Sequence, residues 1–250
     1  TSVGTDQPFI STTKLKKLKL LLPTNSKEQI LIGKTLSDIN ELIKQLDYLI
    51  TKKKNIKQGA IQELITGKRR ISGFNKNWKE ITLEEIGVFT KGKGIKKADV
   101  VDVGLPCIRY GEIYTKYDVF VDKTQSYIQT DIAKKSQQIK KGDLLFTGSG
   151  ETSEEIGKCI TYQGKNPCYA GGDTIIFRTQ ENNPLFLTFL LNSDYVQKQK
   201  STMAQGDMVV HIYSSSLKKL KIKIPDIPEQ LEIAKILFDL HIEIKKLEIE

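Results

Sequence analysis

Cysteine and histidine are scarce in this chain of 250 residues. Its three cysteines, Cys107, Cys159 and Cys168, form no CxxC pair, and its two histidines are His211 and His241. An odd cysteine count without close spacing is typical of a reducing cytoplasm and argues against a zinc site or a disulfide framework. No HExxH motif and no D…ExK nuclease core stands out, so hydrolytic metal chemistry is poorly supported. We therefore expect a cytoplasmic protein without a metal.

Long apolar runs and nucleotide-binding loops are also lacking. No apolar run reaches the roughly 18 residues that a membrane helix needs, and no signal peptide is visible. The sequence therefore predicts no membrane partner. The glycine-rich run at residues 148–152 has neither the G-x-x-x-x-G-K-[ST] spacing nor the G-x-G-x-x-G spacing, so it is not a phosphate loop.

Positive charge is what the chain has in excess. There are 39 Lys and Arg residues against 30 Asp and Glu residues, for a net charge of +9, while 38% of the residues are hydrophobic, as in an ordinary globular protein. This excess favours a polyanionic partner, most simply nucleic acid. A lysine-rich, solvated surface explains the charge equally well.

One segment of the sequence occurs twice. Residues 10–23 and 212–225 correspond at an offset of 202, and both contain Leu-Lys-Lys-Leu-Lys and end at a proline. A Glu-Gln pair follows each copy, at 28–29 and at 229–230. A period this long is not that of a solenoid, whose units run about 20–50 residues. It indicates that a domain-plus-helix unit was duplicated, and that the chain holds one whole unit and the remainder of another.

The hydrophobic pattern divides the chain into five segments. Thr24, Asn25 and Ser26 offer capping oxygens to a long helix that Gly67 ends. The strand-rich part that follows is typical of the α+β class, one globular domain with mixed strands and few helices. The segments are 1–23, the end of a domain with a short strand at 18–22; 24–70, a spacer helix; 71–77, a linker; 78–225, the compact domain; and 226–250, a second helix. In the compact domain we expect strands at 85–90, 105–109, 143–147, 159–162 and 174–178, and one clear helix at 184–200.

Both long helices carry a stripe of apolar residues whose spacing alternates between four and three. This spacing is that of a coiled-coil seam. We expect the two helices to pair, within the chain or across a dimer, and to hold domains at a fixed distance. The alternative is that each stripe packs on its own domain. The stripes are Ile32, Leu36, Ile39, Ile43, Leu46 and Ile50 in the first helix, and Ile233, Leu237, Leu240, Ile244 and Leu247 in the second.

Two segments of the compact domain suit DNA. Residues 91–97 are rich in lysine and glycine, so the backbone can come close to phosphate while lysine neutralises it. Arg109 and Tyr110 follow a predicted strand, where a guanidinium could meet a base edge, since arginine to guanine is the commonest such contact. An ordinary solvated loop is the alternative for each segment.

One motif raises a different possibility. Asn166-Pro167-Cys168-Tyr169 resembles the Asn-Pro-Pro-Tyr motif of amino-group DNA methyltransferases, with Cys168 in place of the second proline. No glycine-rich loop for S-adenosylmethionine follows a strand in the chain. A turn between strands is the better account of these residues.

An ordered set of motifs resembles the target recognition domain of type I restriction–modification specificity subunits. The most specific part is the tail at residues 220–233, followed by the striped helix, and residues 64–71 are similar to the central conserved region of that family. The resemblance covers nearly all of the chain. The other motifs are Trp78-Lys79, Leu105-Pro106-Cys107-Ile108-Arg109, Lys141-Gly142-Asp143-Leu144-Leu145-Phe146, Gly148-Ser149-Gly150-Glu151 and Ala170-Gly171-Gly172-Asp173.

The resemblance implies a non-catalytic subunit with two recognition domains, each reading one half of a split double-stranded DNA site. It implies that the two long helices form an antiparallel coiled coil that sets the gap between the half-sites. Methyltransferase subunits that use S-adenosylmethionine, and through them restriction subunits that use ATP and Mg, would dock on it, with no cofactor in this chain. Residues 1–23 would be the remainder of a first recognition domain. The chain is then the C-terminal part of a longer subunit, or a half-subunit whose homodimer reads a symmetric site.

We expect loops of the recognition domain to enter the major groove. The phosphate contacts are expected from Lys91, Lys93, Lys96 and Lys97, and the base contacts from Arg109, Tyr110, Ser149, Thr152, Gln205, Met208 and His211. Two alternatives stay open: an adenine methyltransferase-like enzyme that uses residues 166–169, and a coiled-coil scaffold without a DNA role.

Overall fold

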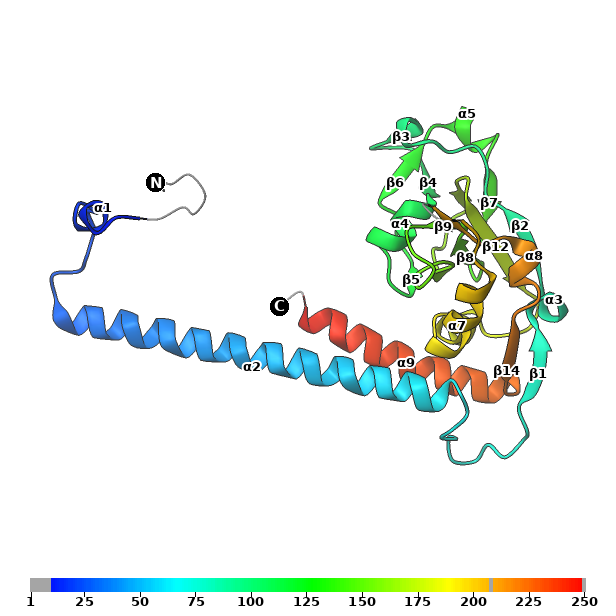
Figure 1. Cartoon of the computed structure of the whole chain (residues 1–250), viewed down its shortest axis with the longest axis horizontal. Helices are drawn as coiled ribbons and strands as arrows, with labels where there is room; N and C mark the ends of the chain where they lie inside the picture. The colour runs from blue at the N-terminus through cyan, green and yellow to red at the C-terminus, as the bar shows by residue number, and fades with distance from the viewer. Residues whose placement is uncertain (1–9, 207–208, 249–250) are drawn as a thin grey trace. The chain divides into compact units, whose positions relative to one another are not determined.

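A computed structural model describes residues 10–206 and 209–248 of the chain (Figure 1). The chain divides into two units, Thr1–Thr51 and Lys52–Glu250. The boundary between them falls inside the long helix α2 (Ser26–Leu64). All of the described strands lie in the second unit.

Helix α2 begins and ends as its local sequence dictates. Asn25 Oδ1 accepts a backbone N–H from two residues on at 2.9 Å, and Glu28 places an acid in the first turn, where the helix dipole favours it. The helix ends before Gly67, whose φ of 69° favours glycine. The Arg69 N–H then donates to the carbonyl of Glu63 at 3.1 Å. The long helix predicted for this part of the chain is therefore present.

The strand predicted at residues 18–22 is wrong. A short helix, α1 (Thr12–Lys16), precedes these residues, and Leu18, Leu20 and Leu22 are exposed. In the second copy of the repeat the matching residues do form a strand, β14 (Lys221–Ile224), because β1 (Lys79–Thr82) pairs with it antiparallel. Residues 18–22 have no such partner, because no described strand lies in the first unit. A strand without a partner would leave its backbone hydrogen bonds unmade.

The apolar stripe in the first unit faces solvent. A helix in water is stabilised mainly by burying one face, so such a stripe indicates a surface that is made to be covered. Coiled-coil pairing along it remains a prediction. Of the stripe residues, Ile32, Leu36, Ile39 and Ile43 are exposed, and Leu46 and Ile50 are half-buried.

Two five-stranded sheets form the body of the second unit. All pairings are antiparallel except β10–β5 and β11–β4, which are parallel. The first sheet has the order β2 (Gly87–Lys91), β12 (Thr174–Thr179), β8 (Leu144–Thr147), β10 (Cys159–Tyr162) and β5 (Phe120–Val121). The second has the order β3 (Val100–Val101), β6 (Ser126–Ile128), β4 (Leu105–Ile108), β11 (Cys168–Ala170) and β7 (Gln137–Ile139). A further pair joins β9 (Ser149–Gly150) to β13 (Val210–His211).

Helices flank these sheets, so the predicted α+β class is confirmed. Two details of the prediction are wrong. Residues 85–90 are a helical turn followed by β2 rather than one strand. Residues 184–200 are two helices, because the Asn192 side chain bonds the backbone of Cys159, and the second helix begins only after Ser193. The helices are α3 (Leu83–Ile86), α4 (Tyr110–Thr115), α5 (Thr130–Ala133), α6 (Pro184–Leu191), α7 (Asp194–Met203), α8 (Ser214–Leu217), α9 (Ile227–Leu247) and the 3-10 turn η1 (Lys97–Asp99).

The first sheet lies between two cores because its side chains alternate. Phe146 and Phe177 point to one face, where they join α6 and α9 in the larger core. Leu145 and Ile176 point to the other face, where they meet Ile108 and residues of the second sheet. This is the period-two alternation of a strand that is buried on both faces.

Helix α9 buries its stripe in its own domain. Ile233, Leu237 and Ile244 are buried, and Leu240 and Leu247 are half-buried. In the larger core, Ile233 and Leu237 join residues of the domain, and Ala60, Ile61 and Leu64 of α2 pack against the same core.

In the second unit, the end of α2 runs antiparallel to α9. Lys53 pairs with Glu243 at 2.6 Å, and Lys54 pairs with Glu248 at 2.8 Å. Farther along, Arg70 makes two 2.7 Å hydrogen bonds to the buried carboxylate of Glu229. Residues 53 and 54 of α2 thus lie against the end of α9, and Arg70, just after α2, lies against its start, so the two helices are antiparallel.

Candidate nucleic-acid interface

The basic loop, residues 91–97, is held rigidly by its glycines. The Lys93 N–H donates to the Ala170 carbonyl at 3.0 Å, and a Cβ at Gly92 would lie only 1.9 Å from the Gly171 carbonyl oxygen. No residue other than glycine fits there without moving the backbone. The four candidate phosphate contacts all project from this loop into solvent, namely Lys91, Lys93, Lys96 and Lys97.

Arg109 is fixed at the start of α4. Its N–H donates to Glu112 Oε2 at 3.0 Å, and its Nη2 lies 3.7 Å from Glu112 Oε1. Burial opposes the ionisation of Glu112, but hydrogen bonds from Ser126, Lys116 and the Arg109 N–H outweigh it and lower the pKa of this carboxyl. The guanidinium is therefore oriented by a buried carboxylate, and Tyr110 beside it is exposed.

Ser149 and His211 meet where β9 pairs with β13. Ser149 Oγ lies 3.0 Å from His211 Nδ1, and the backbones of Gln205 and His211 exchange hydrogen bonds of 3.0 and 2.7 Å. The His211 ring stacks on Tyr213 with 6.4 Å between centroids. Ser149 is buried, so its hydroxyl orients His211 and does not face solvent. Thr152 is exposed nearby in sequence, and Met208 lies outside the described residues.

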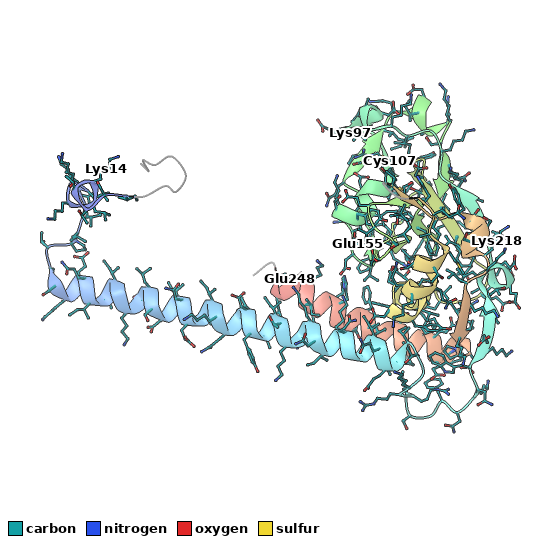
Figure 2. The ribbon with its side chains drawn as sticks, viewed as in Figure 1. Lys14, Lys97, Cys107, Glu155, Lys218 and Glu248 are labelled. Carbon is teal, nitrogen blue, oxygen red and sulfur yellow. The ribbon has the colours of Figure 1, made fainter. Side chains whose placement is uncertain are left out.

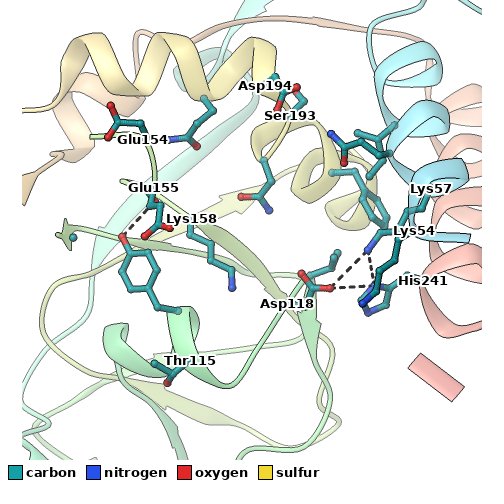
Figure 3. A pocket seen from close by; sticks show the side chains of 18 of the residues that line it. Lys54, Lys57, Thr115, Asp118, Glu154, Glu155, Lys158, Ser193, Asp194 and His241 are labelled. Carbon is teal, nitrogen blue, oxygen red and sulfur yellow. Dashed lines mark hydrogen bonds and ion pairs between the residues drawn. The ribbon is translucent and has the colours of Figure 1, made fainter. Parts of the chain in front are cut away.

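The second unit contains a cleft of about 1120 Å³ (Figure 3). Residues from several elements line it, among them Tyr110, Ser149, Glu151, Lys57 and His241.

Three ionisable groups, one each from α2, α9 and the loop before β5, meet at the cleft. Lys57 Nζ is 3.1 Å from His241 Nδ1, and Asp118 Oδ2 is 3.4 Å from the same nitrogen (Figure 3). Burial and the nearby Lys57 lower the pKa of His241 against the opposing pull of Asp118. The neutral ring therefore accepts from the ammonium, and Phe120 packs on Phe238 beside it at 5.2 Å. These contacts fasten the loop before β5 to α9.

Arg109 connects the two groups of candidate residues. A Cβ built at Gly171 would lie 3.3 Å from Ile95 of the basic loop and 3.5 Å from Arg109 Cγ. Tyr110 follows at once and lines the cleft with Ser149. The structure thus arranges the candidate residues in one succession: Arg109 lies next to the basic loop, and Tyr110 lines the same cleft as Ser149 of the β9–β13 pair. In the view of Figure 2, Lys97 and Glu155 lie on the left side of the domain, with Lys97 above Glu155, and Lys218 lies on the right side.

The methyltransferase-like motif lies in the connection between β10 and β11. Asn166 is exposed, its carbonyl accepts the Tyr162 hydroxyl at 2.6 Å, and Cys168 is buried in β11. This is the turn that the sequence favoured.

Neither a metal site nor a membrane-spanning helix is found among residues 10–206 and 209–248. No group of three or more His, Cys, Asp or Glu side chains there is placed to hold a metal ion. No helix in the same residues has the length and apolar character needed to cross a membrane.

Sequence reasoning missed several residues that shape the site. Tyr114 on α4, and Gln197, Lys200 and Ser201 on α7, all donate to backbone carbonyls of residues 153–157, in the loop after β9. A run of polar residues on a helix reads as a solvated face, so nothing in the sequence marked these side chains as turned inward. Glu112 was equally hidden, because one of its partners, Ser126, comes from the separate strand β6.

Residues 75–250 match the family model of the type I restriction modification DNA specificity domain. The chain therefore belongs to this family. It is 26% identical to the type I restriction enzyme MjaVIII specificity subunit of Methanocaldococcus jannaschii, over 99% of this chain and 61% of that protein. It is 28% identical to the putative type I restriction enzyme specificity subunit S.HindORF215P of Haemophilus influenzae, over 64% of this chain and 39% of that protein.

Solved structures share the fold. The type I restriction–modification S subunit from M. genitalium has a TM-score of 0.67 at 18% identity, over 99% of this chain and 63% of that one. The HsdS subunit from Thermoanaerobacter tengcongensis has a TM-score of 0.59 at 16% identity, over 98% of this chain and 58% of that one. The chain thus spans about three-fifths of the length of these structural relatives.

Proposed function

We propose that this chain acts as a DNA specificity component of a type I restriction–modification system, and that its recognition domain reads one half of a bipartite site. The observation that carries this proposal is the family match over residues 75–250. The succession from the basic loop through Arg109 and Tyr110 to the β9–β13 pair supports it, because phosphate-neutralising and base-reading groups lie next to one another.

In this proposal the chain contributes no catalysis. The chemistry resides in partner subunits: methyltransferase subunits with S-adenosylmethionine, and restriction subunits with ATP and Mg. The two long helices set the distance between half-sites and dock the methyltransferase subunits. The exposed stripe on α2 supports this role, since it offers an uncovered apolar surface. The setting would be the cytoplasm.

The remaining parts of the proposal concern domain organisation. Residues 1–23 are the remainder of a first recognition domain, 24–70 the spacer helix, 71–77 a linker, 78–225 the recognition domain and 226–250 the second helix. The exposed apolar residues of the first repeat copy support this division, since their counterparts in the second copy are buried. The second half-site would be read by a further domain, or by a second copy of this chain.

The salt dependence of DNA binding tests the proposal. We expect Lys96→Ala with Lys97→Ala to weaken binding by a similar factor on every duplex. The slope of log affinity against log salt should fall by about 1 to 2 units, because each phosphate contact contributes about 0.9. Binding is measured by fluorescence anisotropy with duplexes of different sequence, between 50 and 300 mM salt.

The matched control is Lys218→Ala with Lys219→Ala, which removes two adjacent exposed lysines elsewhere on the domain. We expect this variant to keep the slope of the unmodified chain. Absence of salt-dependent binding by the unmodified chain would overturn the proposal and favour a scaffold without a DNA role.

A further inference from the structure

A buried carboxylate lies where the end of α2, the linker and the start of α9 come together. Glu229 is in the first turn of α9, and only 1% of its surface is exposed. It accepts two hydrogen bonds of 2.7 Å from Arg70, one from Nε and one from Nη2. The indole N–H of Trp78 donates to the same carboxylate at 3.2 Å. We call these three residues the joint.

Arg70 also binds the linker. Its Nη2 donates to the Lys76 carbonyl at 2.9 Å, and its guanidinium carbon lies 5.7 Å from the centroid of the Trp78 ring. A guanidinium presents its donors in a rigid planar fork, so it makes these bonds together only in one orientation. Lys76 Nζ lies 3.0 Å from the carboxylate of Asp226, at the N-cap position of α9. The linker is thus fastened to the start of α9 at two points.

Trp78 connects the joint to α2 and to the larger core. Its ring lies close against Gly67, at the end of α2, where an added Cβ would be 3.3 Å from the ring. The ring also meets Phe186 of α6 edge-on, with 6.3 Å between centroids. Ile65, two residues before Gly67, is buried in the same core. One indole therefore touches the end of α2 and α6 while its N–H donates to α9.

Stability alone does not account for a buried carboxylate at this place. The cost of taking an ion pair out of water is often as large as the attraction within the pair, and well-packed apolar residues of similar volume stabilise a protein as well or better. What hydrogen bonds add is direction, because they weaken steeply when donor and acceptor turn away from each other. The joint therefore suits the role of holding one helix at a fixed angle.

The other contacts of α2 in the second unit guide its direction less strictly. Ala60, Ile61 and Leu64 pack against the larger core, but apolar contact is not directional. The ion pairs of Lys53 and Lys54 have partners whose side chains are 50% and 29% exposed, and solvent weakens such pairs.

The direction of α2 matters because the helix is long. Its 39 residues correspond to a length of about 58 Å. A change of about 10° in direction displaces one end of a helix of that length by about 10 Å. This displacement is about three steps of DNA, each about 3.4 Å. A helix that measures a gap in base pairs therefore needs a direction fixed to about 3°.

The repeat carries the same pair of residues at the start of α2. Gln29 Nε2 donates to the Pro23 carbonyl at 2.7 Å, just as Gln230 Nε2 donates to the Pro225 carbonyl at 2.9 Å. The first Glu-Gln pair, residues 28–29, thus keeps the local contact of the second. A glutamate in the first turn of the helix is therefore part of both copies of the unit, as we expect of a residue that orients the helix.

We propose that Arg70, Trp78 and Glu229 are positioning residues that fix the direction of α2 against the recognition domain and, through it, the gap between half-sites. The part of this inference that concerns the gap rests on the proposed function. The direction of α2 can be measured without DNA.

Spin-label distances in the full chain test the direction of α2. Labels are attached at Asn55→Cys on α2 and Asp102→Cys on the domain, which are exposed positions, while the native cysteines are buried. Arg70→Lys keeps the charge but loses the planar fork. We expect it to at least double the width of the distance distribution measured by double electron–electron resonance. Glu229→Gln, with one acceptor oxygen instead of two, should also broaden it.

Two controls separate orientation from stability. Glu232→Gln changes an exposed glutamate of the same helix, and Ile176→Val removes a buried methylene group from the other core, which lowers stability without touching the joint. Both should keep the unmodified width. The inference is overturned if Ile176→Val broadens the distribution as much as Arg70→Lys does, or if Arg70→Lys keeps the unmodified width. Arg70→Lys decides the matter even where Glu229→Gln does not fold.

The gap is tested by methylation sequencing of DNA from cells that carry the modification subunit and this chain. We expect methylated sites with one gap for the unmodified chain, and additional gaps that differ by one or more base pairs for Arg70→Lys. A single unchanged gap despite a broadened distance distribution would overturn the role of the joint in setting it. If the unmodified chain directs no methylation, the proposed function fails instead, and the label distances still decide whether the joint fixes α2.

Discussion

Lys200 carries its ammonium group into the interior of the domain, where burial lowers its pKa to about 8. In the unfolded chain a lysine keeps its proton up to a pH of about 10.4. Between these two values the unfolded state binds more protons than the folded state, so stability must rise with pH. Below pH 8 both states are charged, and the full cost of burying the charge is present.

This argument predicts a pH dependence that Lys200→Met removes. Relative to that variant, the unmodified chain should gain about 3 kcal/mol in free energy of unfolding between pH 7 and pH 10.5. Urea unfolding at several pH values measures the difference. Burial raises the pKa of Cys107 to about 12, which destabilises both proteins alike at high pH and cancels. A difference that stays constant with pH contradicts the prediction.

For the candidate DNA-binding residues, exposure to solvent could be predicted from the sequence in some cases and not in others. Lysines and glycines at 91–97 predict an exposed basic loop, and the loop is exposed. Ser149 looked equally available, yet it is buried and pairs with His211, 62 residues later in the chain. Lys200 looked solvated and is buried. Burial by distant elements cannot be predicted from the sequence neighbours of a residue, which is why the exposure of Ser149 and Lys200 was not foreseen. Whether each candidate residue contacts DNA remains a prediction.

At the scale of elements, the repeat offers two similar segments, residues 10–23 and 212–225, in different surroundings. Ile222 in β14 is fully buried, whereas its counterpart Leu20 is 74% exposed. We therefore expect Ile222→Ala to lower the free energy of unfolding by about 2–5 kcal/mol, as for other buried aliphatic residues. Leu20→Ala should leave it within about 0.5 kcal/mol. Thermal and urea unfolding of both variants measures this, and equal effects would contradict it.

The same comparison explains which elements could be predicted. Strands β4, β8, β10 and β12 are runs of four to six residues with strong apolar character, and their positions were expected. The strands of two or three residues, such as β3, β5 and β9, are too short to show alternation. Residues 18–22 have the pattern of a strand but not the neighbour, so local sequence alone gave the wrong answer. The break between α6 and α7 depends on Asn192 bonding a distant strand.

At the scale of the whole molecule, the uncovered stripe on α2 predicts association. A second copy of this chain would cover it with an identical stripe. We expect Ile39→Glu with Ile43→Glu to shift the chain toward monomer in sedimentation velocity over a range of concentrations. Lys34→Glu, which changes the net charge by the same amount at an exposed position, should not. A chain that is monomeric at every concentration would contradict self-association.

The antiparallel pairing of β1 with β14 also bears on how a gene of this kind can evolve. Lys79 and Ile224 are direct partners, so the polypeptide enters and leaves the body of the domain at adjacent points. A different body with similarly placed ends could replace residues 83–220 in a single recombination event and leave the helices undisturbed. Under the proposed function, a lineage could thus acquire a new target sequence by exchanging this one domain body, and the surfaces that dock the partner subunits would stay the same.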